Sequence, residues 1–145
     1  DLDCFFRGTK ARGEKMAFTL GVDVPFTSLC PCSKEISKYG AHNQRSVCRT
    51  AVRFQEGTEC IFIEDLAAFI EKQGSSPIYP LLKREDEKYV TEAAYENPKF
   101  VEDILRDTVL ALRSLPGIAW FSIECENYES IHNHNAFAAH EETVV

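Results

Sequence analysis

The sequence has no apolar run that approaches the roughly 20 residues of a membrane-spanning helix. Its first fifteen residues lack the apolar centre and the small-residue cleavage site of a signal peptide. These absences predict a cytoplasmic protein with no membrane partner. The chain also lacks an initiator Met, so we expect it to begin inside a longer protein.

Positive charge is scarce relative to negative charge. The chain has 16 Lys and Arg residues against 23 Asp and Glu residues, which gives a net charge of −7. A nucleic-acid backbone needs a basic protein face, so this balance argues against nucleic acid as a partner. A few local cations are still enough to hold a small anion such as a triphosphate.

A secretion signal is missing, so the six cysteines do not predict a disulfide framework. Cys30 and Cys32 lie in a turn-like stretch that is rich in polar residues. The other four lie in apolar, strand-like surroundings and are expected to be small core residues. These four are Cys4, Cys48, Cys60 and Cys125.

The 145 residues, 44% of them hydrophobic and 27% charged, suffice for one domain with a sizeable core. Alternating apolar and polar residues predict strands at 2–7, 15–24, 47–54 and 118–125, with a further one at 136–140. Helical spacing predicts a helix over residues 63–73, and Asn97-Pro98 predicts the start of a second one. The expected fold class is α+β: an antiparallel β-sheet with two helices on one face, in a single domain over 1–145.

Three polar stretches are too irregular to be explained by packing alone. The first covers residues 24–46, where His42 follows Cys30 by twelve positions. A thiolate and an imidazole suit zinc and related metals, and one of each leaves coordination positions open for chemistry. A loop cysteine near a histidine is more often structural or incidental, so that alternative stays open.

The second stretch, residues 81–103, holds seven carboxylates, most of which are expected to form a solvated face. Glu102 differs, because it lies beside an apolar stripe near the N-terminus of a predicted helix. The helix dipole stabilises a negative charge at that position. Glu102 can therefore face a pocket.

The third stretch, residues 126–140, contains Glu129 and two histidines. His132 and His134 alternate in a strand-like segment, so both are expected to point to one side. Histidines transfer protons near neutral pH, although a plain polar loop explains the segment equally well. The residues alone therefore support no more than a metal-assisted hydrolase.

Together, the three stretches resemble the type IB GTP cyclohydrolases. The string SLCPCSKEISKYGAHNQRS carries the most specific match. LLKREDEKYVTEAAYENPKFVED and YESIHNHNAFA match two further family blocks in the same order. The resemblance implies a tunnelling fold (T-fold) that oligomerises into a barrel, as a homo-oligomer of tetramer or higher order. Family proteins resemble two such modules in tandem, and this chain is similar to the second.

The resemblance also implies a metal site. Cys30 would be the thiolate ligand, His42 the imidazole ligand and Glu87 the carboxylate ligand. The implied cofactor is a divalent metal ion, for which zinc, manganese and iron(II) all suit this donor set.

The implied substrate is GTP, and the implied activity is GTP cyclohydrolase I, which opens the guanine at C8 to give 7,8-dihydroneopterin triphosphate and formate. Glu102 would bind the guanine N1–H and 2-amino group. His132, His134 and Glu129 would be the catalytic groups that transfer protons. Candidates for contacts to the triphosphate are Lys34, Lys38, Arg45, Arg49, Lys83 and Arg84.

Three alternatives remain open at this point. A T-fold nitrile reductase of deazaguanine metabolism also pairs a loop cysteine with a purine-holding glutamate, although the sequence has no nicotinamide-binding signature. A non-catalytic half-module would need a partner chain to complete a barrel. A structural zinc domain is the weakest alternative, because a closed zinc site needs four ligands.

Overall fold

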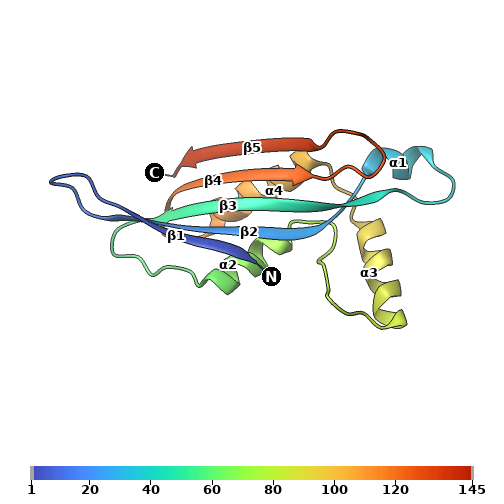
Figure 1. Cartoon of the computed structure of the whole chain (residues 1–145), viewed down its shortest axis with the longest axis horizontal. Coiled ribbons are helices and arrows are strands. Elements are labelled where there is room, and N and C mark those ends of the chain that lie inside the picture. Colours follow the sequence, from blue (N-terminus) through green and yellow to red (C-terminus); the bar gives the residue numbers. More distant parts are fainter. Residues whose placement is uncertain (1, 145) are drawn as a thin grey trace.

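The chain forms an antiparallel sheet whose strands follow the order β1-β2-β3-β4-β5 (Figure 1). The computed structural model describes residues 2–144. The strands are β1 (Asp3–Thr9), β2 (Ala17–Leu29), β3 (Asn43–Phe54), β4 (Ile118–Asn127) and β5 (Ala136–Thr143). The helices are α1 (Pro31–Ile36), α2 (Ile63–Glu71), α3 (Arg84–Glu96) and α4 (Val101–Ser114). Each strand pairs with its neighbour in sequence, so the sheet is a meander.

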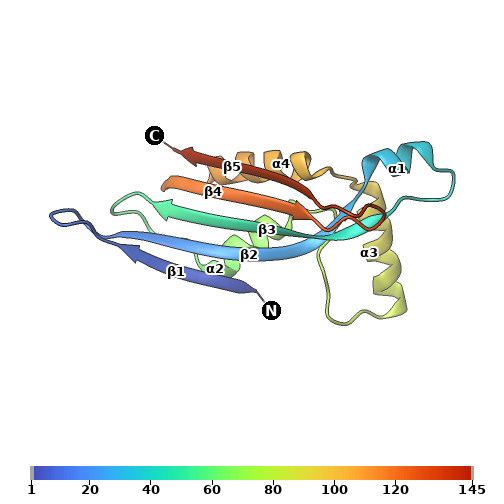
Figure 2. The same ribbon diagram turned by 45° about the horizontal axis from the view of Figure 1, so that its top comes forward.

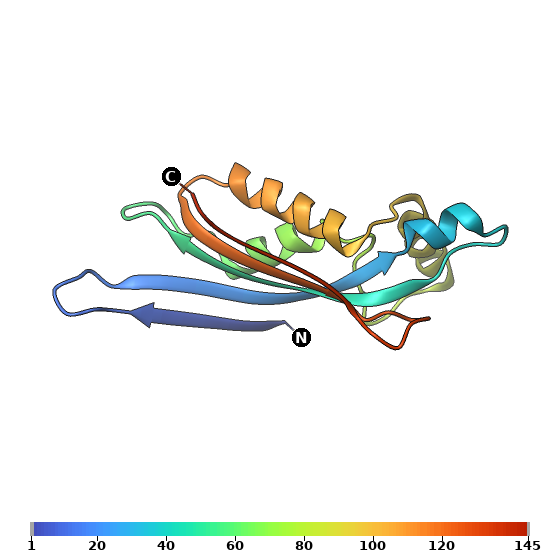
Figure 3. The ribbon, with the colours of Figure 1, turned by 90° about the horizontal axis from the view of Figure 1, so that it is seen from above.

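Two helices form a layer on one face of the sheet (Figure 2, Figure 3). α4 packs against β4 and β5, and α2 packs against β2. α1 and α3 lie near the end of the sheet where β2 ends, and α3 projects away from it (Figure 1). The structure therefore confirms the predicted α+β class, an antiparallel sheet with two helices on one face.

The core lies between the sheet and these two helices. In β2 the alternating residues Val22, Val24 and Phe26 are buried, because successive residues of a strand face opposite sides. α4 meets the sheet with an apolar stripe at helical spacing that includes Ile104 and Leu112. Burial of this apolar surface is the main favourable contribution to folding.

The first two polar stretches are more regular than the sequence predicts. β2 continues to Leu29 and β3 begins at Asn43, so residues 24–46 are strand at both ends. α1 and α3 are absent from the sequence-based prediction because they bury too little to leave an apolar stripe. Ala94 is the only buried residue of α3, and α1 has none. None of the helices in residues 2–144 has the length and hydrophobicity to cross a membrane.

The predicted role of Asn97 as a helix cap is wrong. α4 begins after Phe100, whose N–H donates to the Asp103 carboxylate at 3.1 Å. The Asn97 side chain instead donates to the carbonyl oxygens of Gly74 and Ser75, at 3.1 Å and 3.3 Å. Asn97 therefore ties the segment after α3 to the segment after α2.

The expectation that four cysteines lie in the core holds for two of them. Cys48 and Cys125 are buried on paired strands, with their Sγ atoms 3.6 Å apart. Cys4 and Cys60 are exposed, because β1 is an edge strand and Cys60 lies in the loop that precedes α2.

Two leucines of α4 test how much stability this helix layer contributes. Leu112 is fully buried, whereas Leu110 is 55% exposed. Leu112→Ala is expected to lower the free energy of unfolding by about 2–5 kcal/mol, because a cavity replaces the lost side chain. Leu110→Ala is expected to change it by less than about 0.5 kcal/mol. Urea denaturation followed by circular dichroism measures both, and equal losses would contradict the assigned faces of α4.

Candidate functional site

The end of β2 and the start of β3 bring together a thiol and an imidazole, two kinds of side chain that can bind metals. The strands pair in antiparallel register with Leu29 opposite Asn43, so Cys30 and His42 form the next pair along. The Cys30 N–H donates to the His42 carbonyl oxygen at 3.1 Å. The backbone thus holds a thiol and an imidazole on adjacent chain segments.

The connection between these two residues is itself held in place. α1 begins directly after Cys30 with Pro31, whose fixed φ suits the first position of a helix. The Ser33 hydroxyl donates to the Cys30 carbonyl oxygen at 3.1 Å and accepts from the His42 N–H at 3.2 Å. A single serine therefore bridges the two residues from inside the loop.

The His42 ring makes its hydrogen bonds through one nitrogen. Nδ1 lies 3.0 Å from Gln44 Oε1 and 3.2 Å from Ser130 Oγ. Within residues 2–144, His42 Nε2 and Cys30 Sγ have no hydrogen-bond partner. One nitrogen and one sulfur therefore remain available, and this donor pair fits a metal such as zinc. No sequence motif predicts the roles of Gln44 and Ser130. The only signal is that Gln44 stands in the core-facing row of β3.

A loop that follows β4 reaches the same end of the sheet. The Tyr128 N–H donates to the Arg45 carbonyl oxygen at 2.9 Å, which holds the start of the loop against β3. Two residues further on, Ser130 contacts the His42 ring. The segment with the predicted proton-transfer groups is therefore anchored beside the donor pair.

His132 and His134 both lie in this loop and are exposed. The segment consists of bends, so the expected strand-like conformation is wrong. The two rings still lie together, because they stack with centroids 5.3 Å apart and 15° between their planes. Glu129 precedes them in the loop and is partly buried.

Glu102 lies in the first turn of α4, close to the same end of the sheet. The Lys99 N–H donates to the Leu29 carbonyl oxygen at 3.0 Å, which fixes where α4 starts. Asp103 caps the helix by accepting from the Phe100 N–H. Glu102 is exposed and forms no ion pair within the described part of the chain, so its carboxylate is free to bind a ligand.

The Glu102 side chain borders a groove of about 290 Å³ between α4 and β5. Arg113 and His140 line the same groove, and both contact Glu142, at 2.7 Å and 2.9 Å. The hydrogen bonds from Arg113 and then His140 lower the pKa of Glu142 to about 2. The Glu142 carboxylate therefore stays ionised beside Arg113 at neutral and mildly acidic pH.

Glu87 does not lie with Cys30 and His42. It is exposed on α3, where it lines a shallow surface cleft with its helix neighbours. The end of α3 is tied to α1, because the Tyr95 carbonyl oxygen accepts from Lys34 Nζ. Glu87 stands eight residues before Tyr95, about 12 Å along the helix axis at 1.5 Å per residue. Among residues 2–144, no group of three His, Cys, Asp or Glu side chains is arranged to hold a metal ion. The role of Glu87 stays a prediction.

The uncovered face of the sheet carries a charge cluster around Arg49. Its guanidinium lies 3.1 Å from Glu126 and 3.7 Å from Asp23. Hydrogen bonds from Asn135 and Arg49 lower the pKa of Glu126, so this carboxylate stays charged beside the guanidinium. The positive charge of Arg49 is therefore already balanced by two carboxylates. This makes Arg49 a weaker candidate for a contact to the triphosphate than the other predicted cations.

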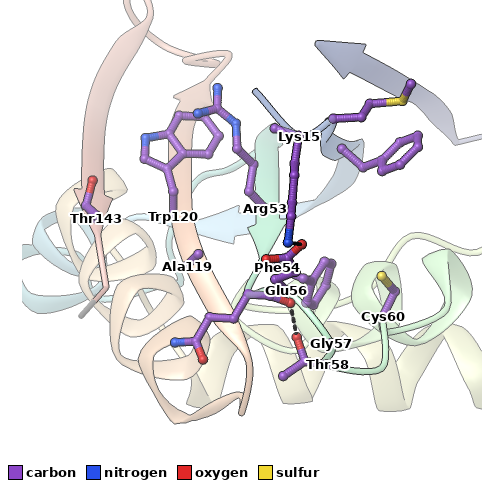
Figure 4. Close-up of a pocket in the computed structure, with 14 residues that line it drawn as sticks. Lys15, Arg53, Phe54, Glu56, Gly57, Thr58, Cys60, Ala119, Trp120 and Thr143 are labelled. Atoms are coloured by element: carbon purple, nitrogen blue, oxygen red, sulfur yellow. Dashed lines mark hydrogen bonds and ion pairs between the residues drawn. The ribbon is translucent and has the colours of Figure 1, made fainter. Parts of the chain in front are cut away.

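A larger cleft lies at the opposite end of the sheet and contains none of the predicted site residues (Figure 4). Its volume is about 580 Å³. The Arg53 guanidinium lies over the Trp120 ring at 4.1 Å, and Lys15 pairs with Glu56 at 2.6 Å (Figure 4). Its cations are thus engaged with an aromatic ring and a carboxylate, and the cleft adds nothing to the donor pair.

The sequence matches a family model described as type I GTP cyclohydrolase FolE2 over residues 1–138. The GTP cyclohydrolase FolE2 of Citrifermentans bemidjiense is 60% identical over 126 residues, which are 87% of this chain and 46% of the relative. That of Geobacter metallireducens is 59% identical over 136 residues, with coverages of 94% and 50%. That of Geobacter sulfurreducens is 59% identical over 139 residues, with coverages of 96% and 52%. The chain spans about half the length of the curated relatives it matches, and the resemblance inferred from its motifs is confirmed.

The carboxylate of Glu142 provides a test of the groove electrostatics. Arg113→Met is expected to raise the pKa of Glu142 from about 2 toward the ordinary value near 4.3. Because the folded-state pKa is depressed, the stability it contributes is present above about pH 4.3 and is lost as the pH falls toward 2. NMR titration of the side-chain carboxyl carbons measures the change. Arg106→Met, a groove arginine that pairs with Asp103, is the control, and an unchanged Glu142 titration in Arg113→Met would contradict the assigned cause.

Proposed function

This chain belongs to the type I GTP cyclohydrolase FolE2 family, and on that premise we propose that it acts as a GTP cyclohydrolase I. The proposed reaction opens GTP hydrolytically at C8 and gives 7,8-dihydroneopterin triphosphate and formate. One observation carries the proposal, the 3.1 Å backbone hydrogen bond that holds Cys30 beside His42. The start of α4 and the loop after β4 reach the same end of the sheet. Since GTP is the proposed substrate, the cytoplasm is the proposed location.

The proposed cofactor is a divalent metal ion, with zinc, manganese and iron(II) as the candidates. Cys30 Sγ and His42 Nε2 would hold it, because both atoms are free of other partners within the described residues. Held there, a metal ion would supply the chemistry of a bound water whose pKa is lowered, a nucleophile near neutral pH. Two protein donors leave coordination positions open for substrate and for a third ligand.

Glu87 is the proposed third ligand. Its place on α3, about 12 Å along the helix from the contact with α1, keeps it apart from the donor pair in a single chain. Glu87 would join Cys30 and His42 as a ligand if α3 moved toward the ends of β2 and β3. The Glu87 of another subunit would serve equally if it reached the same place. The second route agrees with the proposed homo-oligomer of tetramer or higher order.

Glu102 would orient the guanine. A carboxylate accepts two parallel hydrogen bonds from N1–H and the 2-amino group, and charge-assisted bonds of this kind are strong. The dipole of α4 favours negative charge at the helix N-terminus, where this carboxylate lies. Binding the base at this edge leaves the imidazole ring, with N7 and C8, free to face the rest of the site.

The loop after β4 would handle the protons. A histidine that protonates N7 of the guanine makes C8 more electrophilic, and His132 and His134 are the two candidates for this step. Their exposed, stacked rings are open to a substrate. Glu129, in the same loop, would stabilise a protonated His132 or His134 ring, or accept a proton from it.

A non-catalytic half-module is the second candidate. The observation that favours it is length, because the chain covers only 46–52% of the relatives described above. In that case Cys30 and His42 would bind a metal without turnover until a partner supplied the rest of the site. Membership of the FolE2 family favours either of these readings over a nitrile reductase.

Metal add-back with the 145-residue chain tests the proposed activity. The protein is stripped of metal and supplied with zinc, manganese or iron(II), and release of formate and of a fluorescent oxidised pterin from GTP is measured. Cys30→Ala is expected to abolish turnover and to weaken metal binding while the fold is kept, because the thiolate ligand is lost. Cys32→Ala, two residues away and exposed, is the matched control. Turnover by Cys30→Ala would refute the ligand assignment. A folded, metal-binding wild type without product would favour the half-module.

Glu102→Gln tests the binding of the base. The amide is neutral and offers only one acceptor oxygen, so GTP binding is expected to weaken by about 1.5–3 kcal/mol. Equilibrium binding of GTP to the metal-free chain measures this loss without turnover. Glu64→Gln changes a carboxylate in the first turn of α2, the same position on another helix, and is expected to have no effect. Equal GTP affinity in Glu102→Gln and wild type would rule out the anchoring role.

A further inference from the structure

A chain of buried polar side chains stands behind the His42 ring. Ser28 and Ser46 are 0% and 1% exposed, and Gln44 is 7% exposed, although all three point to the core side of the sheet. Gln44 Nε2 donates to Ser28 Oγ at 2.9 Å, and Ser46 Oγ donates to the same oxygen at 2.8 Å. Most buried polar groups in proteins are hydrogen-bonded, and the bond to Ser28 holds the buried Gln44 side chain in place.

In the structure the NH₂ end of the Gln44 amide faces Ser28 and the carbonyl end faces the ring. Because the NH₂ group donates to Ser28, the carbonyl oxygen Oε1 is the atom that meets His42 Nδ1 at 3.0 Å. An amide oxygen can only accept a hydrogen bond. Nδ1 must therefore carry the hydrogen, and the neutral imidazole keeps its lone pair on Nε2.

Ser130 is the other partner of Nδ1, at 3.2 Å, and it cannot make this choice. A hydroxyl both donates and accepts, so it is compatible with either tautomer of the ring. Ser130 also lies in the exposed loop after β4, whereas Gln44 is held inside a strand. The strand residue is therefore the one that selects the tautomer.

We propose that Gln44 is a positioning residue that holds His42 in its Nδ1–H tautomer and presents the Nε2 lone pair to a metal ion. The last part of this inference rests on the proposed metal site. An acceptor behind a histidine ligand fixes the ring and raises its basicity.

The tautomer is measured directly in the metal-free chain. Long-range proton–nitrogen NMR correlations distinguish a protonated ring nitrogen from one with a lone pair. The wild type is expected to show hydrogen on Nδ1. Gln44→Met, which keeps the length of the side chain and removes the acceptor, is expected to give a mixture of tautomers. Gln44→Glu keeps an acceptor and is expected to retain the Nδ1–H form, and Ser130→Ala is expected to match the wild type.

A wild-type ring with its hydrogen on Nε2, or an unchanged tautomer in Gln44→Met, would overturn the inference. Circular dichroism checks that each variant keeps the fold. If Gln44→Met does not fold, Ser28→Ala replaces it. This change removes the hydroxyl that accepts from Gln44 Nε2, so the Gln44 amide can rotate and the His42 tautomers should again be mixed. An unchanged tautomer in a folded Ser28→Ala chain would count against the proposal.

Metal affinity separates this inference from the proposed function. Zinc binding in competition with a chelator is expected to weaken about 10- to 100-fold in Gln44→Met and to stay near the wild-type value in Gln44→Glu. His42→Ala sets the value for loss of the ligand itself. A wild type that binds no zinc would refute the metal site. The NMR result would then decide alone whether Gln44 sets the tautomer of His42. A zinc-binding wild type matched by Gln44→Met would refute the role of Gln44 alone.

Discussion

The antiparallel pairing of β2 with β3 is the constraint on which the candidate site depends. A slip of one residue in this ladder would move every core-facing side chain of a strand to the other face. The buried residues Val22, Val24 and Phe26 oppose such a slip, because all three would lose their place in the core. The same register sets Cys30 beside His42 one step beyond the last ladder pair. Apolar packing in the middle of the sheet thus determines the geometry of two polar residues at its end.

The core-facing side of the sheet changes character along its length. It is mostly apolar through the middle of β2 and β3, where Thr50 is the buried polar exception, and near the donor pair it carries Ser28, Gln44 and Ser46. Asn127, paired with Ser46 on the neighbouring strand, is buried in the same region, and its side-chain oxygen has no partner within residues 2–144. Buried polar groups cost free energy that apolar ones would not. Their presence beside Cys30 and His42 is the kind of local conflict that is expected at functional sites.

Much of the fold follows from local patterns in the sequence. β2, β3, β4 and the two packed helices each bury one face, so their periodicity of two or 3.6 residues is visible along the chain. α1 and α3 bury almost nothing, and no periodicity reveals them. The sequence could single out Cys30 and His42 because a thiol and an imidazole are distinctive residues at a short separation, and the structure places the two side by side. Gln44 could not, because its role depends on a network across two strands, and an isolated glutamine carries no signal of it.

The meander divides the site by separation along the chain. Cys30 and His42 are joined by the short connection between β2 and β3. β4 pairs with β3 as well, but α2, α3 and α4 lie between these two strands in the sequence. Closing a long loop costs more entropy than closing a short one, and local contacts form faster than distant ones. The two donors thus belong to a hairpin that needs no other part of the chain for its closure. Glu102 and the loop after β4 depend on the slower, long-range pairing, so the thiol and the imidazole come together through fewer long-range contacts than the rest of the candidate site requires.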